Sequence, residues 1–195
     1  MHRENFFFIY VRKNKFIYLN NLVLKKIKQI LIKNLTIHYD FHILYFLLSD
    51  GTNCLLELID TPGGEIFRKI LTFLLNKSDT IILMYNINAK KSFEAISDFN
   101  KFIKDNCNED IKVLLLGNKS SLIEKREVSF EEGKSLAKLN NYAFMEVSLK
   151  DIESIKDAIE IAISLGLIRN NSLKFRDNTP VQLISEKKFS EQKCF

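Results

Sequence analysis

The stretch that predicts the fold is an apolar run that ends in an acidic residue and two glycines. It reads Leu55-Leu56-Glu57-Leu58-Ile59-Asp60-Thr61-Pro62-Gly63-Gly64-Glu65. Such a run is typical of a buried strand whose carboxyl end opens into a tight loop. In an open α/β sheet, ligands bind just beyond the carboxyl ends of the strands. An aspartate facing a metal ion and a glycine offering its N–H to a phosphate would be useful there, although Asp and Gly are also common in ordinary turns.

Two later apolar runs also end in polar loops, which gives three motifs in order. One run leads into Asn118–Ser121, and the other passes through Glu146–Lys150. The order and spacing of these motifs resemble those of the Ras superfamily of small GTPases, and the residues around them are most similar to the Rab branch. Asp60–Glu65 stands where that family has Asp-Thr-Ala-Gly-Gln-Glu, and the later two stand for its Asn-Lys-x-Asp and Ser-Ala-Lys loops. The resemblance covers roughly residues 6–165, and three motifs in register are far more specific than one.

The resemblance and the alternation of strands and helices predict the same fold class. This is the three-layer α/β fold of P-loop NTPases, a mostly parallel six-stranded sheet with one antiparallel hairpin edge and helices on both faces. The run at residues 6–11 predicts the first strand, and apolar spacing over Asp151–Leu165 predicts a final helix that stops at Gly166. We expect one small-GTPase-like domain over residues 1–168 and a flexible tail over residues 169–195.

The family binds GTP or GDP with Mg²⁺, so the resemblance implies a set of binding residues. In the family, a threonine of the first switch segment and the aspartate of the Asp-Thr-Ala-Gly-Gln-Glu motif bind Mg²⁺. A glycine of that motif donates its N–H to phosphate, and the last two motifs bind the base. The positions that match are Thr36, Asp60, Gly63, Asn118, Lys119, Ser148, Leu149 and Lys150. Of these, Thr36 and Asp60 would be the metal ligands. No catalytic residue can be carried over.

The family's phosphate cradle has no counterpart in the first part of the chain. A cradle needs backbone N–H groups that converge on the anion, in conformations that only glycine adopts cheaply. All six glycines lie at or after Gly51. Ile17 and Tyr18 stand where the family has the cradle lysine and the Mg²⁺-binding hydroxyl, while Lys13 and Lys15 could attract phosphate only as point charges. We therefore expect no tight triphosphate binding through this loop.

Three further positions depart from the family pattern. Gly64 stands where the family has a glutamine that orients the attacking water, so hydrolysis is expected to be very slow. Ser121 replaces the aspartate that accepts two hydrogen bonds from guanine, and a neutral hydroxyl cannot make that charge-assisted pair. His38 replaces a glycine in the first switch segment and is more typical of a surface or partner-facing histidine than of a metal ligand. Guanine preference is expected to be lost or reduced.

Composition limits the remaining classes. The net charge is +5 and is scattered, so a nucleic-acid-binding stripe is not indicated. The three cysteines are too few and too far apart for a disulfide framework, and no apolar run approaches the roughly 18 residues of a membrane span. A cytoplasmic protein, or one on the cytosolic face of endomembranes, is expected. Cys194 gives only weak support for a lipid anchor, because a single cysteine one residue from the end fits neither prenylation pattern.

Three interpretations remain open at this point. The first is a divergent Rab-like partner-binding module that meets effector or regulator proteins through its switch regions, in vesicle traffic or signalling, with weak or no GTP binding. The second is a slow GTP-hydrolysing switch in vesicle transport. The third is that the first ~35 residues are an incorrectly joined exon, although the preserved spacing disfavours this.

Overall fold

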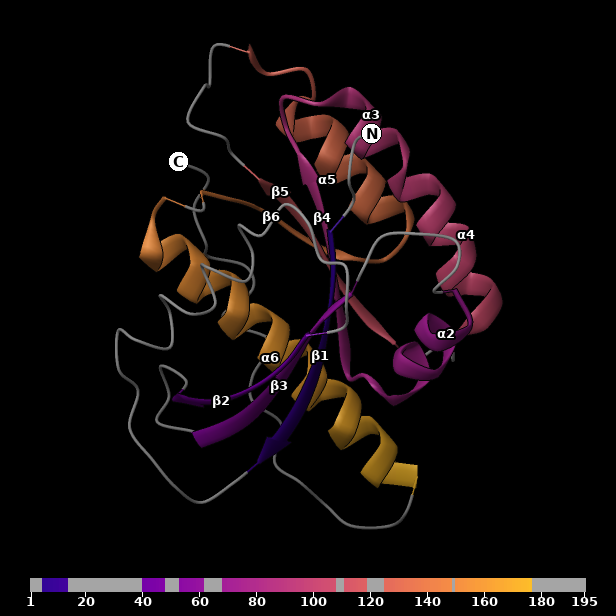
Figure 1. Ribbon diagram of the computed structural model, residues 1–195, viewed down its shortest axis with the longest axis vertical. Helices are drawn as coiled ribbons and strands as arrows, with labels where there is room; N and C mark the ends of the chain where they lie inside the picture. Colours follow the sequence, from indigo (N-terminus) through magenta and orange to yellow (C-terminus); the bar gives the residue numbers. More distant parts are fainter. Residues whose placement is uncertain are drawn as a thin grey trace.

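The computed structural model describes residues 5–13, 40–47, 53–61, 68–107, 111–118, 125–148 and 150–176. Within these ranges, helices cover both faces of one six-stranded sheet, as Figure 1 shows. The strands are β1 (Asn5–Lys13), β2 (Asp40–Leu47), β3 (Asn53–Thr61), β4 (Thr80–Asn86), β5 (Lys112–Asn118) and β6 (Ala143–Val147). The helices are α2 (Arg68–Lys77), α3 (Lys90–Glu94), α4 (Ile96–Asn106), α5 (Phe130–Leu139) and α6 (Ile152–Arg176). The predicted three-layer α/β fold is confirmed.

The strands lie in the order β2-β3-β1-β4-β5-β6. Strands β4, β5 and β6 pair in parallel, while β2 and β3 form the predicted antiparallel hairpin at one edge. Strand β1 is antiparallel to both of its neighbours, β3 and β4. Because β3 and β4 both oppose β1, they run the same way as each other. Four of the six described strands therefore share one direction, and their carboxyl ends point to the same edge of the sheet.

The direction of β1 differs from the prediction of a parallel first strand. Phe6 pairs with Thr61 at the carboxyl end of β3, and Lys13 pairs with Cys54 near its beginning. The carboxyl end of β1 therefore lies at the opposite edge from those of the four aligned strands, and its arrow in Figure 1 points away from theirs. The sequence predicts the strand but does not determine its direction. The alternation of side chains determines which residues lie on each face of a strand, and this pattern is the same for both directions of the strand.

The core consists of two hydrophobic layers, one on each face of the sheet. Along β4, Ile82 and Met84 belong to the layer covered by α6, whereas Ile81 and Leu83 belong to the layer covered by α2, α4 and α5. All four side chains are at most 6% exposed. Burial on both faces explains why β4 is apolar almost throughout, as central strands of α/β sheets are.

The helices on the second face match the sequence pattern closely. Apolar residues at helical spacing over residues 66–75 and 93–103 predict helices, and these segments form α2 and, for the second, α3 and α4. The sequence Ser129-Phe130-Glu131-Glu132 predicts a capping box, and one begins α5: Ser129 Oγ accepts from the Glu132 N–H at 3.2 Å, and Glu132 Oε2 accepts from the Ser129 N–H at 2.7 Å. The amphipathic segment Leu22–Asn34 lies outside the described residues.

The last helix is longer than predicted. We expected a stop at Gly166, yet α6 continues to Arg176. Gly166 and Leu167 are buried, and the Arg169 guanidinium donates to the Ser78 carbonyl at the start of β4. Packing of this last stretch against the sheet offsets the helix-weakening effect of glycine, which is about 1 kcal/mol. Residues 177–195 lie outside the described ranges, so the flexible tail stays a prediction. None of the described helices is long and apolar enough to cross a membrane.

Candidate functional site

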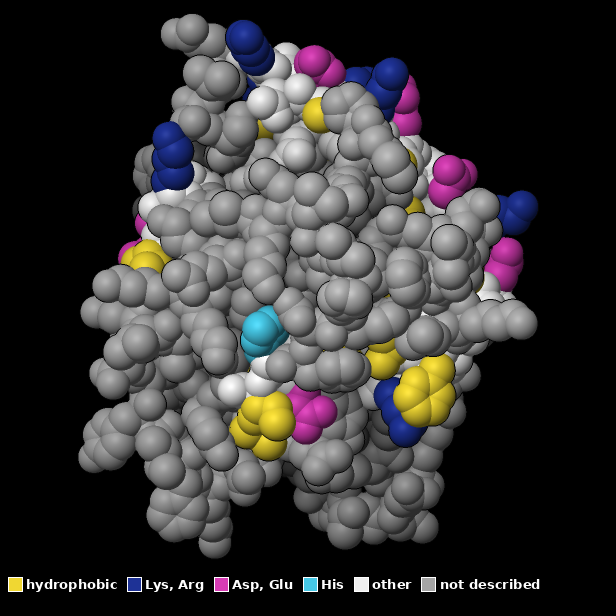
Figure 2. Space-filling model, in the orientation of Figure 1, with side chains coloured by type: hydrophobic (Ala, Val, Ile, Leu, Met, Phe, Trp, Pro, Cys, Tyr) yellow, Lys and Arg dark blue, Asp and Glu magenta, His cyan; other side chains and the backbone are white. Residues whose placement is uncertain are grey.

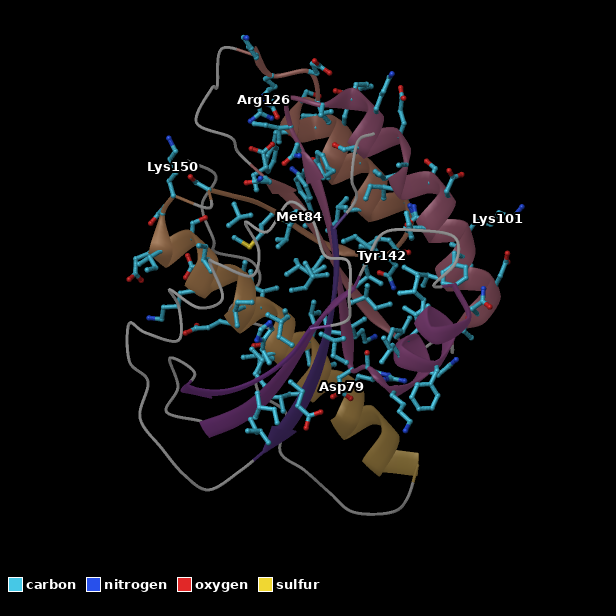
Figure 3. The ribbon with its side chains drawn as sticks, viewed as in Figure 1. Asp79, Met84, Lys101, Arg126, Tyr142 and Lys150 are labelled. Carbon is cyan, nitrogen blue, oxygen red and sulfur yellow. The ribbon has the colours of Figure 1, made fainter. Side chains whose placement is uncertain are left out.

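The carboxyl ends of β4, β5 and β6 bring the predicted base-binding residues together. Asn86 pairs with Asn118 across β4 and β5, and Asn118 pairs with Val147 of β6. Ser148 follows Val147 directly, and Lys150 stands just before α6. Lys150 lies towards this end of the sheet in Figure 3, whereas Asp79, which precedes β4, lies at the other. Three of the predicted site residues therefore share one edge.

The Asn118 side chain is held by a second asparagine. Its Nδ2 donates to Asn86 Oδ1 at 2.9 Å, and the Asn86 backbone N–H donates to Ser92 Oγ at 3.0 Å. Asn118 Oδ1 is buried and has no hydrogen-bond partner within the part of the chain that the structure describes. A buried acceptor without a donor is unfavourable by about 1–3 kcal/mol. What the structure shows for this side chain is its orientation, which the bond to Asn86 fixes at the end of β5.

Backbone hydrogen bonds tie the neighbouring loops to the same place. The Ile87 N–H donates to the Asn118 carbonyl at 3.2 Å. The Ile87 carbonyl accepts from the N–H groups of Glu127 and Val128, at 2.8 and 2.9 Å. The loop before α5 is thus bonded to the loop after β4, which is itself bonded to the end of β5. The surroundings of Asn118 are rigid because of these backbone bonds.

A bidentate ion pair lies beside the ends of β5 and β6. Arg126 Nη1 and Nη2 donate to Glu146 Oε1 and Oε2 at 2.7 and 2.9 Å, and Nη1 also donates to the Val128 carbonyl at 3.0 Å. The Glu146 side chain is only 3% exposed, against 30% for Arg126. The hydrogen bond to Glu146 raises the pKa of Arg126 above its usual value. The pair joins the loop before α5 to β6, next to the base-binding loops.

Tyr85 fills the space between this ion pair and α5. Its side chain is buried, its ring meets Phe93 edge-on at 4.9 Å, and burial raises the pKa of its hydroxyl. A Cβ added at Gly117 would lie 3.0 Å from the Tyr85 hydroxyl oxygen. One added at Gly133 would lie 2.7 Å from Phe144 Cζ and closer still to the Tyr85 hydroxyl. Gly133 is therefore required by the close approach of the Tyr85 and Phe144 rings, whereas a Cβ at Gly117 would need its neighbours to move by only a few tenths of an ångström.

The turn after β6 is closed mainly by its own hydrogen bonds. The Ser148 N–H donates to Ser154 Oγ at 3.1 Å, and the Ser148 carbonyl accepts from the Asp151 N–H at 2.9 Å. Ser148 Oγ accepts from the Lys150 N–H at 3.4 Å. Leu149, whose N–H would meet a base in the family, lies outside the described residues. Its role stays a prediction.

Fewer residues of the predicted phosphate and metal side are described. Phe7 of β1 pairs with Asp60 of β3 on one side and with Ile82 of β4 on the other. Asp60 is therefore level with Ile82, which precedes Asn86 by four residues. Four residues of strand span roughly 13 Å. The side chain of Asp60 and all of Thr36, Gly63 and Lys119 lie outside what is described. In the described ranges, no group of three His, Cys, Asp or Glu residues could hold a metal ion.

The described residues include more of the predicted base side than of the predicted phosphate side. On the base side, Asn118 presents a buried acceptor and is braced from two loops. On the phosphate side, the strand that should deliver the cradle ends with Lys13 beside Cys54. That pairing is six β3 residues away from Asp60, or roughly 20 Å. The direction of β1 and the lack of early glycines both disagree with a phosphate cradle of the family type.

Sequence reasoning missed Asn86 and Arg126 as parts of the site. Asn86 is a polar residue at the carboxyl end of an apolar strand, which is the signal that singled out Asn118. Arg126 carried no such signal, because it lies in a loop and its partner Glu146 is 20 residues further along the chain. Only the fold brings that pair together.

Comparison with known proteins gives the family. The Ras family profile matches residues 21–165, which leaves out β1 and the positions of Ile17 and Tyr18. Ras-related protein Rab-8A of Gallus gallus is 38% identical over 145 residues, covering 74% of this chain and 69% of that protein. Ras-related protein Rab-13 of Rattus norvegicus is 34% identical over 150 residues, covering 74% and 73%. RabQ of Dictyostelium discoideum is 32% identical over 136 residues, covering 69% and 67%. The chain belongs to the Ras family of small GTPases and is Rab-like.

Proposed function

We infer that this chain is a divergent Rab-like protein that works as a partner-binding module, with weak or no GTP binding. Its setting would be vesicle traffic or intracellular signalling, in the cytoplasm or on the cytosolic face of endomembranes. Its partners would be effector or regulator proteins that contact the switch regions, which include α2. Family membership supports the setting, and the altered nucleotide positions support the loss of turnover.

The observation that carries the proposal is the direction of β1. In the family the cradle follows directly from the first strand, so its N–H groups stand beside the metal-binding aspartate. Here the residue that ends β1, Lys13, lies beside Cys54, and Asp60 lies at the other end of β3. The chain is back at the Asp60 end of the sheet by Asp40, which pairs with Asp60, but it contains no glycine before Gly51 with which to form a close-approach cradle.

One observation favours the alternative of a slow GTP-binding switch. The buried Asn118 acceptor and its brace by Asn86 are what a base-binding site needs. A nucleotide held mainly by its base would still lack the charge-assisted guanine contact, because Ser121 is neutral. Binding of this kind would be weak and would discriminate poorly between GTP and ATP.

Thermal melting of the full chain separates the two functions. The protein is melted alone and with excess GTP, GDP or ATP, each with Mg²⁺. A ligand at a hundred times its Kd adds about 2.7 kcal/mol, which in a chain of this size raises Tm by roughly 5–10 °C. We expect no guanine-specific shift. A shift of that size with GTP or GDP alone, lost in the Asn118→Ala variant, would overturn the proposal and establish a guanine-nucleotide site.

A further inference from the structure

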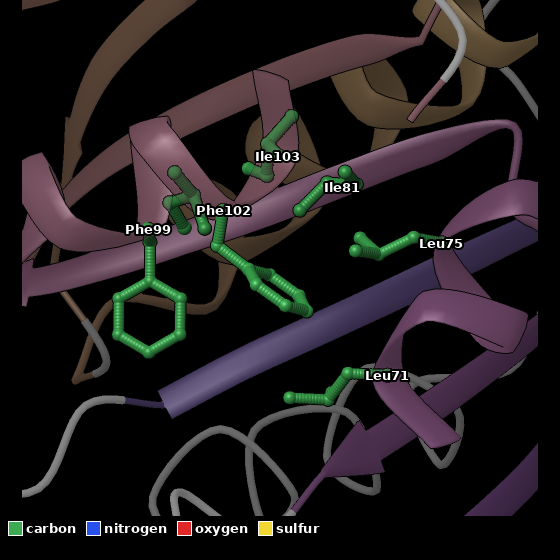
Figure 4. A pocket seen from close by; sticks show the side chains of 7 residues that line it. Leu71, Leu75, Ile81, Phe99, Phe102 and Ile103 are labelled. Carbon is green, nitrogen blue, oxygen red and sulfur yellow. The ribbon is translucent and has the colours of Figure 1, made fainter. Parts of the chain in front are cut away.

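The inner face of helix α2 is packed tightly against α4 and β4. Leu71 and Leu75 are buried and face Phe99 and Phe102 of α4, with Ile81 of β4 between them, as Figure 4 shows. The gap that remains among these side chains is about 10 Å³. That is no more than the space for one water molecule. The described part of α2 is therefore held by a well-filled apolar contact.

Polar contacts from the end of α4 reinforce this packing. Asn76 Nδ2 donates to the Asn106 carbonyl at 3.0 Å, and Thr72 Oγ1 donates to Asn106 Oδ1 at 3.4 Å. Asn106 Nδ2 in turn donates to the Phe102 carbonyl at 2.9 Å. Asn106 thus joins the two helices with both its side chain and its backbone. Every one of these groups belongs to α2 or α4, and a nucleotide contributes to none of them.

The outer face of α2 exposes an aromatic ring beside a cation. Phe73 is 57% exposed, although Leu74 and Leu75, which follow it, are buried. Lys77 Nζ lies 4.3 Å from the centroid of the Phe73 ring. Figure 2 shows hydrophobic and basic side chains together where α2 lies, at the lower right. An exposed ring of this kind is a common anchor point in protein interfaces.

The charge of α2 indicates what would cover that ring. Its sequence contains Arg68, Lys69 and Lys77 and no acidic residue. We propose that the outer face of α2, around Phe73 and Lys77, is a docking surface for an acidic protein segment with an apolar anchor, and that α4 holds this surface in place without nucleotide. The proposal rests on the partner-binding function inferred above and specifies the chemistry of the partner.

Charge complementarity favours this occupant over a second copy of the chain. In a two-fold symmetric dimer the same patch meets itself, so two α2 helices would bring like charges together. An acidic segment instead gains attraction from the basic side chains while its apolar residue covers Phe73. Binding should weaken as salt is raised, because Lys77 is exposed.

Selection from a random linear peptide library displayed on phage tests the partner chemistry, with the full chain as bait. The enriched peptides are expected to carry Asp and Glu around an aromatic or aliphatic residue. Their affinity should fall at least about tenfold with Phe73→Ala and with Lys77→Glu. Leu139→Ala is the matched control, because Leu139 is 82% exposed on α5 and should leave affinity unchanged. No enrichment, basic or neutral binders, or binding that survives Phe73→Ala would overturn the proposal. Tighter binding of an RNA oligonucleotide to the same face would do so too.

Hydrogen exchange tests whether the contacts with α4 hold α2 in place without nucleotide. The α2 amides are expected to exchange at the same rate with and without GDP, GTP and Mg²⁺, and severalfold faster in the Asn106→Ala variant. Asn140→Ala is the matched control at the end of α5: Asn140 Nδ2 makes the same bond to the carbonyl four residues before it, at 2.9 Å, and Asn140 Oδ1 accepts from Lys104 Nζ of α4 at 3.0 Å, a contact to α4 that does not involve α2. Nucleotide-dependent exchange, or equal effects of the two variants, would contradict the inference.

The two proposals can fail separately. Suppose that a guanine nucleotide shifts the melting temperature, while α2 exchange is unchanged and the selected peptides are acidic. The proposal of weak nucleotide binding would then be wrong, and the docking surface would stand. Absence of any melting shift, together with binders that ignore Phe73, would sink the docking surface alone.

Discussion

The base side and the phosphate side of the nucleotide edge differ in how they are tied to the rest of the molecule. On the base side, Asn86 with Asn118 and Arg126 with Glu146 link three strand ends and two loops. On the phosphate side, the first strand ends at the opposite edge of the sheet, and no glycine precedes Gly51. The base-side contacts also stabilise the fold, so they are useful without nucleotide. A phosphate cradle, in contrast, contributes only when a phosphate is bound.

Removal of the guanidinium on the base side should have the largest effect. Arg126→Ala leaves the Glu146 carboxylate, whose side chain is 3% exposed, without its bidentate partner. Breaking a buried ion pair lowers the free energy of unfolding by roughly 3–5 kcal/mol. Because Arg126 is partly exposed, we expect a loss of about 3 kcal/mol. Urea denaturation at neutral pH measures the loss.

The control for that change is an ion pair at the surface. Lys156 Nζ lies 4.0 Å from Glu153 Oε2, and the Glu153 side chain is 72% exposed. Lys156→Ala should change the free energy of unfolding by less than about 1 kcal/mol. If the two variants lost equal stability, the base-side ion pair would not be part of what holds the fold.

A methyl group at Gly133 should have the next largest effect. Its Cβ would lie 2.7 Å from Phe144 Cζ and closer to the Tyr85 hydroxyl, so Gly133→Ala should destabilise by about 2 kcal/mol through overpacking. Tyr85→Phe removes the hydroxyl, which has no partner among the described residues, and should itself change little. The double variant should recover part of the loss in a double-mutant cycle. Strictly additive losses would show that Tyr85 and Gly133 are not in contact.

Acid should loosen the junction between α3 and α5. Hydrogen bonds from Lys90 and then from the Ser129 N–H lower the pKa of Glu132 to about 2. The unfolded pKa is higher, about 4.3, so this contribution to stability is present above that pH and is lost as the pH falls from there towards 2. The difference in Tm between wild type and Glu132→Gln should therefore shrink over that window. A difference that stays constant from pH 6 down to about pH 2.5 would contradict the assignment, and Glu131→Gln serves as the control.

Restoring a single family residue should have the smallest effect of all. Ser121→Asp supplies the acidic side chain that reads guanine in the family, but it leaves the phosphate side unchanged. We expect GTP with Mg²⁺ to leave the Tm of this variant where it was. A rise of several degrees would mean that the missing aspartate alone had prevented binding, and that the phosphate side is better formed than β1 indicates.

Most of the fold could be predicted from local patterns. Apolar runs at residues 6–11, 43–48, 55–59, 80–86, 113–116 and 142–148 predict the six described strands, and Ser129 with Glu132 marks the start of α5. The direction of β1 could not be predicted, because it depends on pairing with β3 and β4 and not on the pattern within the strand. The stop at Gly166 was wrong because burial of Leu167 and Arg169 outweighs the weak helix propensity of one glycine.

The site was predictable only where a motif lay on one strand end. Asn118, Ser148 and Lys150 stand together at one edge, as the order of the strands predicts. The brace from Asn86 and the pair of Arg126 with Glu146 depend on contacts between segments 20 or more residues apart. Such contacts leave no periodicity in the sequence.

The most direct test of weak nucleotide binding is the nucleotide content of the purified chain. The protein is isolated quickly in Mg²⁺ buffer without added nucleotide, denatured, and its released nucleotide is quantified by chromatography against a family member with an intact cradle treated in parallel. The account predicts far less than one nucleotide per chain, with no preference for guanine. A content close to one GDP or GTP per chain would contradict it, and would require a phosphate site built by residues outside the family pattern.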